Sequence, residues 1–73
     1  MQPNADDVLS QLLNIAGAML ACGAEINRVE DTLTRLGMAY GAAQMHVFVI
    51  TSSVVITMVL PDGSHYTQTR RIH

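Results

Sequence analysis

Lysine is absent from this chain of 73 residues, and cysteine occurs only once, as Cys22. The four arginines are too sparse for the basic surface of a nucleic-acid-binding protein, so we expect no nucleic-acid partner. A single cysteine excludes a disulfide within the chain and fits a reducing compartment. Because Cys22 stands at the end of an apolar helical face, we expect a buried and unreactive side chain.

Motifs for metals, cofactors and catalysis are also missing. His46, His65 and His73 show no metal-ligand spacing, and no second cysteine joins them, so we expect no metal. No phosphate-binding loop, activated nucleophile or evident pocket accompanies the acidic residues. We therefore expect no cofactor, no catalytic residue and no enzymatic activity.

No apolar run is long enough for a membrane helix. The apolar stretch from Met45 to Leu60 is shorter than the ~20 residues that a spanning helix needs, and Thr51-Ser52-Ser53 interrupts it. Its content of valine, isoleucine and threonine favours strands. The first seven residues lack the basic and apolar regions of a secretory signal. We expect that the chain, as given, neither crosses a bilayer nor is exported.

The composition that is present fits one small globular domain over residues 1–73. Apolar residues make up 49% of the chain and the formal net charge is -2. A chain this short usually needs a disulfide, a metal or a partner to be stable. Since the first two are not expected, a partner surface is the expected stabiliser.

Apolar periodicity predicts two helices, at about residues 7–22 and 25–40. The first stripe consists of Leu9, Leu12, Leu13, Ala16, Met19 and Leu20, and the second of Ile26, Val29, Leu33, Leu36 and Tyr40. Gly23 and Gly41 are placed to end them. The short loop between the helices predicts an antiparallel hairpin.

Three further features bear on these helices. Asp6 and Asp7 favour the first helix start. Asn27 and Glu30 have capping-box spacing, although Glu25 could equally lie in the first turn of the second helix. Inside that helix, Asp31 and Arg35 are spaced for an ion pair, and Gly37 predicts the close approach of a neighbouring backbone.

Three strands are predicted after residue 43, at about 45–50, 54–60 and 64–72. Pro61-Asp62-Gly63 is a strong turn signal between the last two strands. The fold class is therefore α+β, with an antiparallel helix hairpin packed on a three-stranded antiparallel meander (αα-βββ). The third strand is the most polar, which is typical of an exposed edge.

Both faces of this sheet carry apolar residues. In the first strand Met45, Val47 and Val49 alternate with Phe48 and Ile50, and the second strand is similarly apolar on both sides. Two helices cover only one face. We expect the other face to be covered by further chain, a second copy or another protein.

The densest charge lies at the start of the second helix, in Glu25, Arg28, Glu30 and Asp31. Glu25 and Arg28 share a helix face, whereas Arg28 and Glu30 do not. Two interpretations remain open: solvated charges at a helix start, or a specific ion pair or docking contact.

The residues from Gly17 to Gly41, G-A-M-L-A-C-G-A-E-I-N-R-V-E-D-T-L-T-R-L-G-M-A-Y-G, carry a family resemblance. They are followed by V-F-V-I-T, an apolar strand, D-G and T-R-R-I. This pattern, from about Val8 to Ile72, resembles the N-terminal domain of the threonine/serine exporter family, the ThrE and YjjP-like proteins. The position of R-V-E-D between Gly23 and the V-F-V-I-T strand makes the match moderately specific.

The resemblance implies a bacterial inner-membrane transporter whose hydrophilic N-terminal domain faces the cytoplasm and precedes several membrane helices. Some members work with a smaller membrane subunit. The matching positions are Gly17, Gly23, Arg28, Val29, Glu30, Asp31, Gly41 and Thr51. Of these, the motif or docking candidates are Gly23, Arg28, Glu30, Asp31 and Thr51. Since the chain stops at His73, before any membrane segment, we expect an excised domain or fragment that cannot itself transport.

Three functions compete. The first is a regulatory, assembly or gating domain that docks on the membrane-embedded remainder of the exporter, and that associates with itself or with the smaller subunit. The second is a ligand-sensing module that binds an amino acid or a dicarboxylate between helices and sheet. The third and weakest is a cryptic hydrolase.

Overall fold

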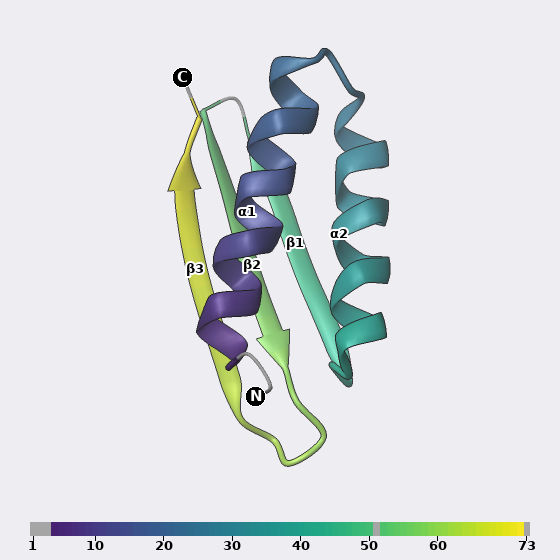
Figure 1. Cartoon of the computed structure of the whole chain (residues 1–73), viewed down its shortest axis with the longest axis vertical. Coiled ribbons are helices and arrows are strands. Elements are labelled where there is room, and N and C mark those ends of the chain that lie inside the picture. Colours follow the sequence, from purple (N-terminus) through teal and green to yellow (C-terminus); the bar gives the residue numbers. More distant parts are fainter. Residues whose placement is uncertain (1–3, 51, 73) are drawn as a thin grey trace.

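The chain forms two layers, with a helix hairpin on one face of a three-stranded sheet (Figure 1). The computed structural model describes residues 4–50 and 52–72. The elements are α1 (Ala5–Ala21), α2 (Ile26–Tyr40), β1 (Gln44–Ile50), β2 (Ser53–Val59) and β3 (His65–Arg71). The sheet is antiparallel in the order β1-β2-β3. The predicted α+β class and αα-βββ order are confirmed, and every element end lies within two residues of its predicted place.

The helix starts differ from those predicted. Asn4 caps α1, because its side chain accepts a hydrogen bond from the amide of Asp7 at 2.8 Å. This cap starts the helix two residues earlier than the apolar pattern indicates. The start of the second helix, which the sequence left open, follows Glu25, and Glu25 makes no side-chain cap. Asn27 already lies inside the helix, so the spacing of Asn27 and Glu30 does not form a capping box.

Gly23 and Gly41 end the two helices as predicted, with φ values of 83° and 124°. After each helix, two successive amides bond back to carbonyl groups of the last turn: Gly23 to Leu20, Ala24 to Met19, Gly41 to Met38, and Ala42 to Gly37. This pair of hydrogen bonds is the Schellman motif, which needs a residue with positive φ.

The core lies between the helices and the inner face of the sheet. The largest fully buried side chains come from three elements: Leu9, Leu13, Leu33, Ile56, Met58, Val29 and Val54. Burial alternates along β2 with period two, as the pleat of a strand requires, and places Val54, Ile56 and Met58 in the core.

The buried stripe of α2 is narrower than predicted. It consists of Val29, Leu33 and Gly37, at a spacing of four residues. The other predicted members are substantially exposed: Ile26 (48%), Leu36 (40%) and Tyr40 (37%). α2 packs on β1, an outer strand, so fewer of its side chains reach the sheet (Figure 1).

Cys22 is exposed, so the prediction of a buried thiol is wrong. The cysteine follows the last residue of α1 and lies in the turn between the helices, not on the apolar face. The apolar pattern extended the helix by one residue and thereby assigned Cys22 to the core.

The turn between β2 and β3 forms at Pro61-Asp62-Gly63, as predicted. The Gly63 amide bonds the Leu60 carbonyl, and the Leu60 amide bonds the Ser64 carbonyl, both at 2.9 Å. The hydroxyl and amide of Ser64 also donate to the Asp62 carboxylate, at 2.6 and 2.9 Å. These two hydrogen bonds lower the pKa of Asp62, because they favour its charged form.

Gly37 is approached by a side chain, not by the backbone that was predicted. A Cβ at this position would lie 2.8 Å from Cγ of Met45, and nearer still to its Sδ and Cε. Gly37→Ala gains about 1 kcal/mol of helix propensity but forces Met45 out of its packed position, at a cost of about 1–3 kcal/mol. We expect a net loss of about 1 kcal/mol in the free energy of unfolding, measured in urea.

The double variant Gly37→Ala/Met45→Ala provides the control. Removing the Met45 side chain removes the clash, so Met45→Ala is expected to cost less in the Gly37→Ala background than in the wild type. Equal costs in the two backgrounds would show that the two side chains do not compete for this space.

Candidate functional site

The motif residues predicted from the sequence do not converge on one site. Gly23 acts through its backbone, at the end of α1. Thr51 lies outside the described residues. The remaining three, on α2, are spread around the helix.

Arg28 and Glu30 point to nearly opposite sides of α2, because residues two apart are separated by about 200° around a helix. Asp31 forms the predicted ion pair with Arg35, at 3.0 Å between Oδ2 and Nε. Both side chains are largely exposed, 61% for Asp31 and 80% for Arg35, so the pair contributes about 0.3 kcal/mol. In the described chain Arg28 forms no ion pair. This arrangement is typical of solvated helix-surface charges.

The sheet face opposite the helices carries an apolar area, which we call the open-face patch: Phe48, Ile50, Val55 and Val59. Phe48 is 64% exposed and Ile50 is 60% exposed, the two highest values among the large apolar side chains of the described residues. Phe48 pairs with Val55 across the β1–β2 register. The patch thus lies over β1 and β2, on the face that no described helix covers (Figure 1).

Towards β3 the open face is polar, so the prediction of two apolar faces holds only for β1 and β2. Thr57 and Thr67 share a hydrogen bond of 2.8 Å across β2 and β3. His46 and His65 are both exposed and lie on the two outer strands with β2 between them, offset by two residues, which separates their backbones by about 12 Å. They do not form a direct pair.

A polar ladder joins α1 to the inner face of β3. The amide group of Gln68 donates to the Asp6 carbonyl at 2.9 Å and accepts from the hydroxyl of Ser10 at 3.2 Å. Two residues further along β3, the guanidinium of Arg70 donates a hydrogen bond to Oδ1 of Asn14. From one hydrogen-bonded pair to the next, α1 advances by four residues and β3 by two. These steps cover similar distances, about 6.0 and 6.7 Å, so successive pairs stay aligned.

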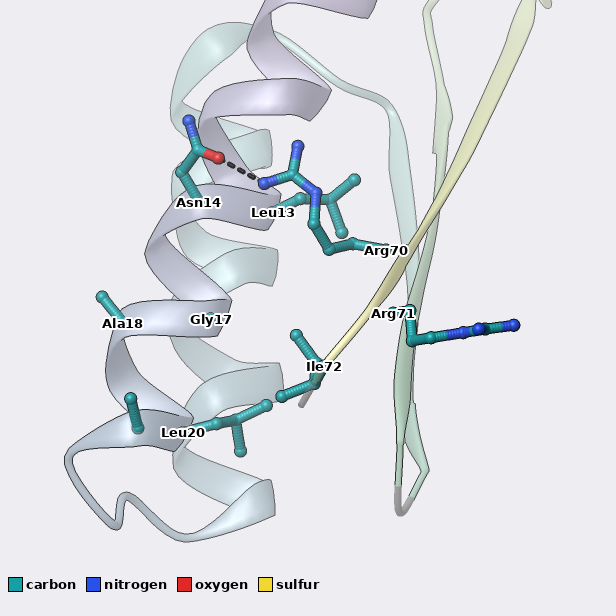
Figure 2. A pocket seen from close by; sticks show the side chains of 9 residues that line it. Leu13, Asn14, Gly17, Ala18, Leu20, Arg70, Arg71 and Ile72 are labelled. Atoms are coloured by element: carbon teal, nitrogen blue, oxygen red, sulfur yellow. Dashed lines mark hydrogen bonds between the residues drawn. The ribbon is translucent and has the colours of Figure 1, made fainter.

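Beyond the hydrogen bond of Arg70, α1 and the end of β3 line an open hollow of about 330 Å³ (Figure 2). Its lining combines small and apolar residues with two arginines: Leu13, Asn14, Gly17, Ala18, Leu20, Ala21, Arg70, Arg71 and Ile72. Arg70 points towards α1, whereas Arg71 points away from it (Figure 2). Gly17, Ala18 and Ala21 are too small to reach across to β3, so the space beyond the Arg70–Asn14 pair stays open.

Sequence reasoning did not single out Asn14, Gln68 and Arg70. Two signals mark them: polar residues recur every four positions at Asp6, Ser10 and Asn14, and every two positions at Gln68 and Arg70. Either pattern alone is common on a solvent-exposed surface.

Residues 4–50 and 52–72 provide neither a metal site nor a membrane helix. No group of three or more histidine, cysteine, aspartate or glutamate side chains within these ranges is arranged to hold a metal ion. In the same ranges, no helix combines the length and apolar character that crossing a bilayer requires.

The geometry therefore defines a class, a two-layer α+β domain with one open sheet face. A sequence model of the ThrE family, described as "Putative threonine/serine exporter", matches residues 10–73. The chain belongs to this family, which confirms the resemblance found in its sequence. Neither the curated proteins nor the solved structures gave a significant match.

Proposed function

We propose that this chain is the soluble N-terminal domain of a bacterial inner-membrane exporter and acts in its assembly or gating from the cytoplasmic side. In this proposal the open-face patch docks on the membrane-embedded remainder of the exporter, and the domain has no catalytic role. Membership of the threonine/serine exporter family supports the exporter context. The exposure of Phe48 and Ile50 on the uncovered sheet face is the observation that carries the docking role.

The energetics favour a protein partner for the patch. Burying a phenylalanine or isoleucine side chain stabilises by about 1.5–3 kcal/mol when the burial is complete, and most of that gain is unused in the isolated chain. The β1–β2 register places Phe48 directly opposite Val55, and Ile50 lies two residues further along β1 on the same face. An apolar area with a polar rim is typical of an interaction surface.

A single substitution tests this docking. Phe48→Ser is expected to weaken binding of the chain to the membrane-embedded part of the exporter about tenfold, because the variant removes a large side chain from the centre of the patch. Titration calorimetry in detergent measures the affinity. Thermal unfolding of the isolated chain should change little, since Phe48 contributes little to the core.

Met38→Ser provides the matched control. Met38 is 47% exposed but lies on α2, away from the open face, so its replacement should leave the affinity within about twofold of wild type. Equal binding by wild type and Phe48→Ser would contradict the docking role. Light scattering on the isolated chain separates this role from self-association, which would instead bury the patch between two copies.

A further inference from the structure

On the opposite side of the molecule, Arg70 has no acidic partner among the described residues. Arg70 lies on the inner face of β3, opposite Val54 of β2, and it is partly buried. The ion pair found within the described residues joins Asp31 and Arg35, and no acidic residue lines the hollow beside Arg70. A guanidinium group has five N–H donors, whereas its side-chain partner within the described residues is the neutral Asn14.

From this geometry we infer that the hollow between α1 and β3 binds a small organic carboxylate with a short apolar chain. Arg70 receives the carboxylate through two parallel N–H···O hydrogen bonds, the geometry that a guanidinium group favours. Asn14 holds the guanidinium towards the hollow (Figure 2). The apolar chain lies against Leu13, Leu20 and Ile72.

The size and lining of the hollow fit this class of ligand. Its volume of about 330 Å³ lies at the lower end of the range for small-molecule sites. Gly17 adds no side chain to the lining, and a Cβ placed there would lie 3.9 Å from Cδ1 of Ile72, in ordinary contact. This inference does not rest on the docking proposal, because the hollow and the open-face patch lie on opposite faces of the sheet.

Binding of sodium butyrate to the 73-residue chain tests the site. We expect a dissociation constant of about 1 mM, with chemical-shift changes in the Gly17 amide and the Ile72 methyl groups, and no such changes with sodium chloride or neutral butyramide. L-threonine should bind several-fold more weakly, because no acidic side chain of residues 4–50 and 52–72 lines the hollow to pair with its ammonium group. Equal binding of butyramide, or tighter binding of threonine, would overturn the assigned class.

Two arginines provide a matched pair of variants. Arg70→Gln should weaken butyrate binding at least about tenfold, whereas Arg28→Gln, which removes the same charge from an exposed side chain of α2 that does not line the hollow, should stay within about twofold. Equal effects of the two variants would show that binding depends only on the overall charge of the chain, and would overturn the inference.

Asn14→Asp covers the case in which Arg70→Gln does not fold. The new carboxylate should pair with Arg70 and compete with the ligand, so that butyrate binding weakens about tenfold while the melting temperature stays equal or rises. Undiminished binding by this variant would overturn the inference.

Discussion

Ile56→Ala is expected to remove about 3 kcal/mol from the free energy of unfolding, the largest loss that we predict for a single side chain. Ile56 is 0% exposed at the middle of β2, the central strand, so its truncation leaves a cavity that neither layer is free to fill. A domain of this length has a total stability of roughly 4–11 kcal/mol. The melting temperature should therefore fall by about 15 °C, measured by circular dichroism.

Phe48→Ala is the control for this prediction, because it truncates an apolar side chain outside the core. It removes more atoms than Ile56→Ala, yet Phe48 is 64% exposed on the open face. We expect a change within about 0.5 kcal/mol in the isolated chain. A loss as large as that of Ile56→Ala would mean that the open face is buried in solution, for instance between two copies of the chain.

Gly41→Ala is expected to cost about 2 kcal/mol, the second-largest effect. At φ 124° and ψ 11° the backbone of Gly41 lies outside the regions that a residue with a side chain adopts readily. The substitution meets no neighbouring atom within 4 Å, so the whole cost comes from backbone strain. Urea unfolding measures it.

Gly17→Ala makes the same chemical change with the opposite expected sign. Gly17 lies inside α1, and its added Cβ would make only ordinary contact with Ile72. We expect a gain of about 0.5–1 kcal/mol from helix propensity. If both variants lose stability equally, helix-end geometry is not what distinguishes Gly41.

The sequence predicts the fold well where a repeating pattern and a stop signal agree. Burial along β2 follows the apolar alternation because a strand has no other way to present its side chains. Gly23 and Gly41 end their helices because few other residues adopt their backbone angles without cost. Local chemistry decides these features, so one chain is enough to predict them.

Predictions from the sequence fail where the outcome depends on how separate helices and strands pack against one another. Gly37 marks a close approach in either case, but only the packed structure shows that the neighbour is the Met45 side chain. The exposure of Ile26 and Tyr40 depends on the position of α2 over an outer strand. Neither fact is encoded in the periodicity of the helix itself.

The candidate sites divide in the same way, between features set by local sequence and features set by packing. The alternation in β1 was enough to predict that Phe48 and Ile50 share a face, but only the structure shows that this is the face without helices. The charged motif around Arg28 suggested a site that the helix geometry disperses. Arg70 and Asn14 meet only because α1 crosses β3, and they are 56 positions apart in the sequence.

That separation has a consequence for how the protein folds. Helix α2 docks on the strand that follows it, and the sheet is a simple meander, so most of the molecule forms from neighbours in sequence. Helix α1 packs against α2, its neighbour in sequence, but its hydrogen bonds to β3 require the last strand: the bond from Gln68 to Asp6 spans 62 positions. Closing so long a loop slows folding. During synthesis on the ribosome, the first helix to emerge therefore completes its contacts only when the last strand has been made.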